Sequence, residues 1–369
     1  MNILITVSSR WWNATSYYAI SLAEALKDTE NKVYVAGDPG FPSPLQAKKF
    51  GLETIEIRFS SYNPLLLLKD LFKLYLFVKE RHIDIIHTHC PQDHLISALV
   101  AKKMKISLLR TLSDVRPPKD NFINRWLHFK KTDFHITSSD SNLTRYNSTW
   151  PDFGPQCAVI PGGVRGEKVH TIEKKRELLE KFKIPSGTKI VGIIARLAPV
   201  KDHATFIMAA SLVLESVPDV HFLICGSEAE ITRNDLKALA ENVNLNSNIV
   251  FSDHYEPVNE IMSILDVGVI SSKGSEVISR VAMEYLAIGV PVVATDVNVL
   301  PEIIKNGRNG YIVSAENSFE MSEAIIKILK DQSIKEKFSK NNLSDFKNKF
   351  EMKIVAKSVL NIYHNLIES

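Results

Sequence analysis

The sequence predicts an α/β protein built from two doubly wound domains. Short runs of β-branched and apolar residues alternate with amphipathic helical patterns through all 369 residues. The strand patterns are apolar throughout, which is typical of parallel strands covered by helices on both faces. The chain is also longer than the roughly 250–300 residues that one hydrophobic core usually serves. The strand and helix pattern restarts after the turn signal PGGV at Pro161–Val164, so we expect two domains of the same class.

The first domain is predicted over residues 1–165 and the second over residues 166–352. Strands of the first are expected at Asn2–Val7, Lys32–Ala36, Thr54–Ile57, Ile83–His87, Ser107–Arg110, Phe134–Thr137 and Ala158–Ile160. Strands of the second are expected at Lys189–Ala195, Val220–Cys225, Ile249–Ser252, Val267–Ile270, Val292–Thr295 and Tyr311–Val313. An amphipathic helix within residues 353–369 could return to the first domain. Because open α/β sheets bind ligands at the carboxyl ends of their strands, we expect a ligand cleft between the domains.

Composition excludes several classes of protein. A net charge of +3, from 45 basic and 42 acidic residues, gives no electrostatic argument for nucleic-acid binding. Three distant cysteines indicate a reducing compartment rather than a disulfide framework. The N-terminus lacks the pattern of a signal peptide. The longest apolar stretch, Pro64–Val78, is interrupted by charges and is shorter than the roughly 20 residues that span a bilayer. We therefore expect a cytoplasmic protein.

The stretch Leu65–Val78 has two explanations. Its lysines, Lys69, Lys73 and the following Lys79, lie on the polar side of a predicted helix, as in a helix that packs on a sheet with one solvated face. A basic amphipathic helix also suits an anionic membrane surface. A modest basic cluster formed by Arg125, Lys130 and Lys131 surrounds Trp126 and does not decide between them.

The stretch ARLAPVKDHATF places two cations at the end of a strand. Arg196 and Lys201 lie on the loop between that strand and a helix expected to begin near Asp202–His203. Guanidinium, ammonium and unpaired N–H groups at a helix N-terminus together form an anion site. Two solvated loop cations would give the same pattern, so this stretch alone leaves both explanations open.

The stretch EVISRVAMEYLAIGVPVVATD carries two glutamates among apolar residues. A helix is predicted from the N-cap Ser279 to Ile288, with Gly289 in the left-handed position. Glu276 then lies on the preceding loop and Glu284 lies inside the helix. A carboxylate there costs stability unless it is hydrogen-bonded, and a sugar diol would provide such bonds. Exposure to solvent or a pair with Arg280 would also explain Glu284.

Taken together, these stretches resemble the C-terminal half of the retaining glycosyltransferases of family 4. The matching features run in order from 189 to 313: ARLAPVKDH, FLICGSE, VGVISSKGSE, two glutamates with seven residues between them, MEYLAIGVPVVATDVNVLPEII and NGRNGYIV. Weaker family features in the first half are IDIIHTH, ITSSD and VIPGGV.

The resemblance implies a GT-B architecture of two Rossmann-like domains, the second of which holds a nucleotide-diphosphate sugar as substrate, with no cofactor. By that resemblance Arg196 and Lys201 bind the donor diphosphate. Glu284 binds the ribose hydroxyls, and Glu276 lies beside the transferred sugar. Further donor contacts are expected from backbone N–H groups after Glu276 and from the region of the base, at Val277, Ile278, Ser279, Asp253 and His254.

The charges of these residues agree with the implied reaction. Two fixed cations and a helix N-terminus can neutralise a leaving diphosphate without a metal ion. No metal-binding carboxylate motif lies near them, so we expect metal independence. Retention is expected by attack on the same face of the sugar, with the leaving phosphate helping to deprotonate the acceptor. A covalent intermediate on Glu276 is the alternative. The expected acceptor is a glycan or a lipid-linked glycan of polysaccharide, lipopolysaccharide or glycolipid synthesis.

The first domain departs from the family pattern in the loop SSRWWNATS, where many relatives carry a pair of glycines. Arg10, Trp11 and Trp12 occupy this loop instead. Aromatic faces suit stacking on a sugar or an apolar acceptor, and they also suit local packing, so both explanations stay open.

A second departure is RTLSDVRPPKD, where several relatives have a histidine that reaches the donor sugar. Ser113, Asp114 or Arg116 would take its place and contact the acceptor or the sugar. Two histidines, His87 and His89, lie near the end of another strand. His87 is an acceptor-side candidate, although one of this pair is expected to orient loops rather than act as a base.

Two other functions share parts of this pattern. A GT-B nucleotide-sugar epimerase would need acid and base carboxylates in the cleft, and a two-lobed small-ligand binding protein would carry an export signal. The sequence instead carries the two glutamates with Arg196 and Lys201, and it shows no export signal, so it favours a glycosyltransferase.

Overall fold

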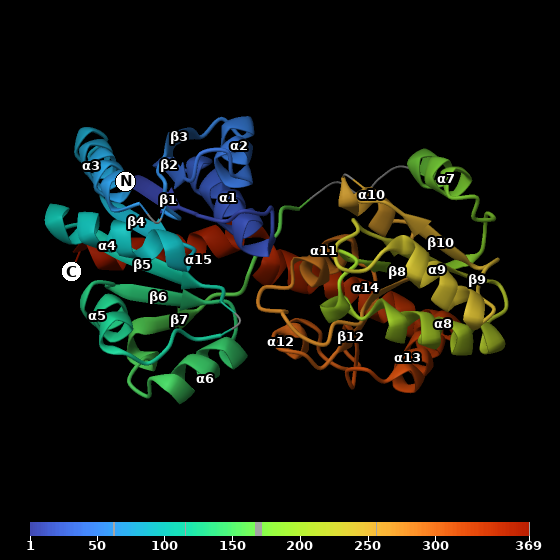
Figure 1. The fold of residues 1–369 in the computed structure, drawn as a ribbon. Helices are drawn as coiled ribbons and strands as arrows, with labels where there is room; N and C mark the ends of the chain where they lie inside the picture. Colours follow the sequence, from blue (N-terminus) through green and yellow to red (C-terminus); the bar gives the residue numbers. More distant parts are fainter. Residues whose placement is uncertain (62, 115, 167–171, 256, 369) are drawn as a thin grey trace. The chain divides into compact units, whose positions relative to one another are not determined.

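The computed structural model describes residues 1–61, 63–114, 116–166, 172–255 and 257–368. It divides the chain into two compact units, unit 1 (Met1–Arg165 with Lys349–Ser369) and unit 2 (Gly166–Asn348). Each unit contains one parallel sheet with helices packed against it (Figure 1). The α/β class predicted from the alternating patterns is confirmed.

Unit 1 is built on a seven-stranded sheet in the order β3-β2-β1-β4-β5-β6-β7. Its strands are β1 (Asn2–Thr6), β2 (Lys32–Gly37), β3 (Glu53–Glu56), β4 (Ile85–Thr88), β5 (Ser107–Leu112), β6 (Phe134–Thr137) and β7 (Cys157–Val159). Its helices are α1 (Ala14–Lys27), α2 (Pro42–Lys49), α3 (Pro64–Glu80), α4 (Pro91–Met104), α5 (Phe122–Lys130), α6 (Asp140–Thr149) and α15 (Met352–Glu368). The strand order reverses between β1 and β4, where open α/β sheets bind their ligands.

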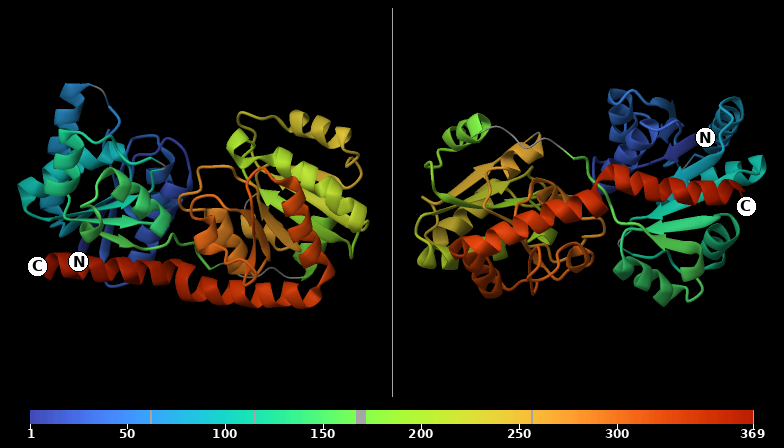
Figure 2. Two further views of the ribbon diagram at one scale, coloured as in Figure 1. Left: turned by 90° about the horizontal axis from the view of Figure 1, so that it is seen from below. Right: turned by 180° about the vertical axis from the view of Figure 1, so that it is seen from behind.

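Helices α3, α4 and α5 pack over one face of this sheet. Their buried side chains, including Leu74, Ile96 and Leu127, join Leu4 and Ile86 of the strands in one apolar core. On the other face α1 packs against α15, which Figure 2 shows from behind.

The C-terminal helix α15 is fixed to unit 1 by specific bonds. The hydroxyl of Tyr363 lies 2.7 Å from Nδ1 of His87, and Ser107 Oγ donates to the carbonyl of Leu366 at 3.0 Å. Gly163 packs so closely on this helix that a Cβ would lie 2.9 Å from Val355 Cγ2. A helix far away in the sequence therefore completes the core of the first unit.

Unit 2 is built on a six-stranded sheet in the order β10-β9-β8-β11-β12-β13. Its strands are β8 (Lys189–Ile194), β9 (Val220–Cys225), β10 (Ile249–Ser252), β11 (Val267–Ile270), β12 (Val292–Thr295) and β13 (Gly310–Val313). Its α-helices are α7 (Ile172–Lys181), α8 (His203–Ser216), α9 (Arg233–Asn242), α10 (Val258–Met262), α11 (Arg280–Ile288), α12 (Leu300–Ile303), α13 (Ser318–Lys330) and α14 (Gln332–Asp345). The switch point of this sheet lies between β8 and β11.

Every strand predicted from the sequence is present, and each end lies within two residues of its predicted position. The apolar runs identify these strands because both faces of a parallel sheet are buried. The order of the strands in each sheet depends on packing between segments that are distant in the sequence, so it could not be predicted from the individual apolar runs.

Candidate active site

The predicted donor residues of unit 2 follow the two strands at its switch point. Strands β8 and β11 pair directly. Arg196 and Lys201 lie on the loop after β8, and Glu276 lies on the loop after β11. Because parallel strands end at the same edge of the sheet, these three residues lie next to one another at its carboxyl edge.

Hydrogen bonds join the two loops. The N–H of Lys273 donates to the carbonyl of Val200 at 3.0 Å, and Ser271 Oγ donates to the carbonyl of Lys201 at 2.8 Å. The backbone around Lys201 is therefore held against the loop that carries Glu276.

Lys201 and Glu276 form a salt bridge across these loops. The Glu276 side chain is 3% exposed and that of Lys201 is 23% exposed. Ser272 Oγ donates to the same carboxylate oxygen, Oε1, at 2.7 Å. A buried carboxylate needs such partners to remain charged. The pair leaves a fixed, partly exposed ammonium group at the carboxyl edge of the sheet.

Arg196 does not take part in this pair. Its side chain is exposed and makes no hydrogen bond or ion pair with any described residue. The guanidinium is therefore available to a ligand, which is compatible both with a role in anion binding and with a solvated loop cation.

The N-terminus of α11 offers unsatisfied donors beside this pair. Ser279 stands at the predicted N-cap position, but its φ of 49° is left-handed and its side chain makes no cap hydrogen bond. Its Oγ is buried without a partner among the described residues, which likewise supply no acceptor for the N–H of Ile278 or Ser279. The predicted N-cap position is confirmed, but the side chain of Ser279 does not make the capping hydrogen bond. The third predicted N–H donor, at Val277, belongs to a residue that is 6% exposed.

Glu284 lies one turn into α11 and is paired with Arg280. Arg280 Nε donates to Glu284 Oε1 at 2.6 Å, and the two side chains are 25% and 14% exposed. The pair with Arg280 that the spacing suggested is therefore present in the structure. An arginine four residues before a glutamate is the less favourable order for helix stability.

Close packing on glycine fixes the position of α11 on the sheet. The buried ring of Tyr285 lies against Gly268 of β11, where a Cβ would approach its ring atoms to 2.7 Å. Its hydroxyl donates to the carbonyl of Gly192 in β8 at 3.4 Å. Glu284, the preceding residue, is held near the switch point by this contact.

The two residues predicted near the base follow edge strand β10. Asp253 is 82% exposed on its side chain and forms a salt bridge with Arg233 at the start of α9. His254 is exposed next to it. Both lie at the carboxyl edge, but three strands away from Glu276 in the order of the sheet.

Gly226, at the end of β9, was not among the predicted site residues. A Cβ at this position would lie 1.8 Å from the carbonyl oxygen of Ala195. Only glycine allows the ends of β8 and β9 to approach so closely. The signal in the sequence was a glycine directly after the apolar run FLIC.

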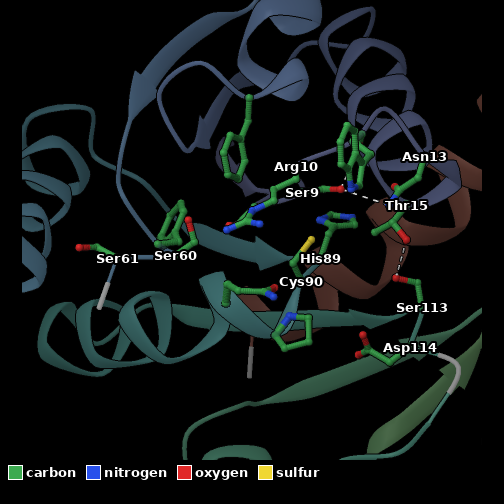
Figure 3. A pocket seen from close by; sticks show the side chains of 16 residues that line it. Ser9, Arg10, Asn13, Thr15, Ser60, Ser61, His89, Cys90, Ser113 and Asp114 are labelled. Carbon is green, nitrogen blue, oxygen red and sulfur yellow. Dashed lines mark hydrogen bonds between the residues drawn. The ribbon is translucent and has the colours of Figure 1, made fainter. Parts of the chain in front are cut away.

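A second candidate region is a pocket of about 730 Å³ at the carboxyl edge of the sheet in unit 1. Of the predicted acceptor-side residues it is lined by Arg10, Trp11 and Asp114, and Trp11 is 75% exposed. His89 and Cys90 also line it, as Figure 3 shows.

Hydrogen bonds between three loops build one wall of this pocket. Ser8 Oγ donates to Asp38 Oδ2 at 2.6 Å, and Ser60 Oγ donates to Asp38 Oδ1 at 2.6 Å. These residues follow β1, β2 and β3 respectively. Ser8, Asp38 and Ser60 were not predicted as site residues, because a serine or an aspartate after a strand is common in every α/β protein.

A buried arginine supports Asp114 on the opposite side of the pocket. Arg110 of β5 is 1% exposed; it donates to the carbonyl of Cys90 at 2.6 Å and to Asp114 Oδ2 at 2.9 Å. Asp93 is buried nearby and accepts from the N–H of Ser8 at 3.0 Å. Burial raises the pKa of Asp93 to about 8, although Arg110 acts against this shift. Arg110 and Asp93 do not line the pocket themselves, but they hold in place three residues that do, Ser8, Cys90 and Asp114.

Three predicted acceptor-side residues do not line the pocket. His87 is fully buried, with its ring nitrogens 2.7 Å from Tyr363 and from Thr111, so it fixes α15 to the sheet. Trp12 packs edge-on against Tyr17 at 6.2 Å between ring centroids. Arg116 is exposed outside the set of pocket residues. Of the two histidines, His89 lines this pocket and His87 does not.

The described residues contain neither a metal-binding cluster nor a membrane-spanning helix. Residues 1–61, 63–114, 116–166, 172–255 and 257–368 contain no group of three or more His, Cys, Asp or Glu side chains arranged to hold a metal ion. Over the same residues, no helix is long and apolar enough to cross a membrane.

Two family models match the chain, one in each half. The model of Glycosyltransferase Family 4 matches residues 15–167, and that of Glycosyl transferases group 1 matches residues 174–345. Together they span most of both units, and the second contains Lys201, Glu276 and Glu284.

The chain is similar to two named relatives. Spore coat protein SA of Bacillus subtilis is 28% identical over 241 residues, covering 62% of this chain and 64% of that protein. The N,N'-diacetylbacillosaminyl-diphospho-undecaprenol alpha-1,3-N-acetylgalactosaminyltransferase of Campylobacter jejuni is 24% identical, with 96% of each chain covered.

Solved structures share the fold. A glycosyltransferase from Rickettsia africae superimposes with a TM-score of 0.89 at 21% identity, over 100% of this chain and 99% of that one. Anabaena HepE in complex with UDP-glucose gives 0.83 at 18% identity, over 99% of this chain and 100% of that one. With both family models in place along the sequence and this fold, the chain belongs to glycosyltransferase family 4 and has the GT-B fold.

Proposed function

We propose that this glycosyltransferase moves a sugar from a nucleotide-diphosphate donor to a glycan or lipid-linked acceptor, with retention of configuration and without a metal ion. Unit 2 holds the donor, and the pocket of unit 1 receives the acceptor. The observation that carries the proposal is the salt bridge between Lys201 and the buried Glu276 beside the open N-terminus of α11.

These groups suit a leaving diphosphate. When the bond between the sugar C1 and the phosphate oxygen breaks, negative charge develops on the diphosphate. The ammonium of Lys201, the exposed guanidinium of Arg196 and the unsatisfied donors at Ser279 can stabilise that charge without rearranging.

Retention follows if the acceptor oxygen attacks C1 on the face that the diphosphate leaves. The acceptor proton then passes to the departing phosphate oxygen, and no residue needs to act as nucleophile. The position of Glu276 supports this route over a covalent intermediate, because Lys201 and Ser272 both bond to its Oε1. Bonds of this kind lower the nucleophilicity of a carboxylate and leave it to orient sugar hydroxyls.

Relatives suggest the acceptor class. The Campylobacter jejuni relative is named for a diphospho-undecaprenol acceptor, and a further relative in Staphylococcus aureus is named for capsular polysaccharide biosynthesis. An acceptor of this type would place the enzyme in the cytoplasm at the inner face of the membrane.

Release of nucleoside diphosphate from UDP-, GDP- and ADP-sugars tests the donor claim. We expect one class to be hydrolysed slowly without acceptor, with no loss in EDTA, and the product anomer determined by NMR to match the donor. An epimer of the donor sugar as the only product would identify an epimerase instead. The proposal would be refuted if none of the three nucleotide sugars were hydrolysed and none changed the melting temperature of the protein.

Replacing Glu284 with glutamine is expected to weaken nucleotide affinity about 10-fold, since a good hydrogen bond to a charged group contributes about 1.5 kcal/mol or more. The free energy of unfolding should fall by less than about 1 kcal/mol, because the variant loses only the ion pair with Arg280 within one helix. Calorimetric titration and thermal melting measure both. Arg280→Ala is the matched control, since it breaks the same pair but keeps the carboxylate. Normal affinity with reduced stability in Glu284→Gln would show that the residue is structural.

A further inference from the structure

Helix α3 of unit 1 exposes an apolar stripe. Leu65 is 77% exposed, Leu68 62%, Phe72 61% and Leu76 38%. Their spacing of three and four residues places them along one side of the helix. The helix buries a different side, with Leu74 and Val78, in the core.

The neighbouring helices continue this surface. Helix α4 contacts α3 and exposes Leu95 and Leu99, which are 43% and 40% exposed. Helix α5 begins with Phe122 and Ile123, which are 82% and 65% exposed, and its Leu127 joins the same core. We call this surface, on the outer sides of the three helices, the α3–α5 face.

The three helices run in the same direction relative to the sheet. Each follows a parallel strand, so each begins at the carboxyl edge of the sheet, where the pocket with Arg10 and Asp114 lies. The exposed apolar residues of α4 and α5 are at the beginning and middle of the helices, and those of α3 run from Leu65 to Leu76. Lysines lie along α3 at Lys69, Lys73 and Lys79, and at the ends of α4 and α5 with Lys102, Lys103 and Lys130.

The basic end of the face forms a hollow of its own. A pocket of about 440 Å³ is lined by Lys102, Lys105, Lys130 and Lys131. Its acidic residue, Asp133, accepts from the N–H of Leu108 at 2.7 Å, so part of its charge is already compensated. The pocket therefore attracts anions.

We infer that the α3–α5 face docks on a bilayer that contains anionic lipids. Exposed leucine and phenylalanine side chains would enter the boundary between headgroups and acyl chains, while the lysines would meet lipid phosphates. Charge complementarity selects this occupant: the apolar stripe is accompanied by cations, whereas an interface with a second copy would bring these lysines close to their own counterparts. The three helices begin at the carboxyl edge of the sheet, where the pocket of unit 1 lies. Docking would therefore bring this pocket near the bilayer that carries a lipid-linked acceptor.

Co-sedimentation of the full chain with vesicles tests the inference. Vesicles of phosphatidylcholine with phosphatidylglycerol should bind the protein at least tenfold more tightly than phosphatidylcholine alone, with weaker binding at high salt. The double variant Leu68→Ser/Phe72→Ser should lose at least tenfold in vesicle affinity. Lys102→Gln/Lys103→Gln should lose the preference for anionic vesicles. Phe319→Ser on α13 of unit 2, where the side chain is 66% exposed, is the matched control and should bind as the parent protein does.

Two results would overturn the inference. One is equal vesicle binding by Leu68→Ser/Phe72→Ser and the parent protein. The other is a sedimentation measurement in which this variant converts a dimer into monomers, since the face would then be an interface between copies. Vesicle binding requires neither donor nor acceptor, so its outcome is independent of the proposed function. The variant should retain donor hydrolysis and its parent melting temperature, which excludes unfolding as the cause.

Discussion

Replacing Lys201 with alanine is expected to lower the rate of sugar transfer about 100- to 1000-fold, because the variant loses a fixed cation at the leaving diphosphate. The variant should also be less stable, by about 1–3 kcal/mol, since the nearly buried carboxyl group of Glu276 would lose its ion pair and keep only Ser272 as partner. Steady-state kinetics and chemical denaturation measure the two effects separately.

The double variant Lys201→Ala/Glu276→Gln separates catalysis from folding. The neutral amide no longer needs the ammonium group, so stability should return toward that of the parent while activity stays low. Lys327→Ala, on the exposed side of α13, removes a cation elsewhere in unit 2 and should change neither quantity. Full activity in Lys201→Ala would refute its role at the diphosphate, and a double variant no more stable than Lys201→Ala would refute the structural coupling of the pair.

The sequence located this pair because strand ends are easy to recognise. Apolar runs place β8 and β11, and polar residues that follow such runs lie at the carboxyl edge of the sheet. Once the two strands are neighbours, Lys201 and Glu276 are close. Their direct salt bridge was not predicted, since it depends on the conformations of two loops that are tied by Lys273 and Ser271.

Other features needed the three-dimensional arrangement. Gly226 is explained by the carbonyl of Ala195, which belongs to a different strand. Asp38 ties Ser8 and Ser60 together at the unit 1 pocket because the loops after β1 and β3 both reach it. His87 and His89 are both fully buried, with ring centroids 4.2 Å apart, yet only His89 lines the pocket. The difference depends on where β4 ends, between Thr88 and His89, and an apolar pattern does not give strand ends to the residue.

Unit 1 contains an unusual number of buried histidines, and this has a consequence for acid stability. Burial lowers the pKa of His89 to about 3, of His128 to about 2 and of His135 to about 3, and it lowers the pKa values of His87 and His94 well below the usual range. The buried Arg110 acts in the same direction on all five. These rings stay neutral in the folded unit.

The sign of the effect follows from the pKa values. A histidine whose folded pKa is depressed contributes stability that is present above about pH 6.5, the pKa of the unfolded chain, and that is lost as the pH falls toward the folded pKa. Asp93 opposes this trend, because its folded pKa of about 8 makes the folded unit gain stability as the pH falls from 8 toward 4. Because five histidines act against one carboxyl group, the free energy of unfolding of unit 1 should fall by up to about 5 kcal/mol for each pH unit below pH 6.

Unit 1 is therefore expected to unfold between about pH 6 and pH 4, because the total stability of a domain is about 5–15 kcal/mol. All four tryptophans of the chain, at positions 11, 12, 126 and 150, belong to this unit, so their fluorescence reports its unfolding. Trp150 is fully buried, with its ring centroid 5.1 Å from that of His128. Denaturant unfolding followed by this fluorescence at several pH values gives the free energy of unfolding as a function of pH. The variant His128→Gln should reduce the slope of that dependence by about 1.4 kcal/mol per pH unit. A free energy of unfolding that stays constant from pH 7 to pH 5 would contradict the neutral state of these rings.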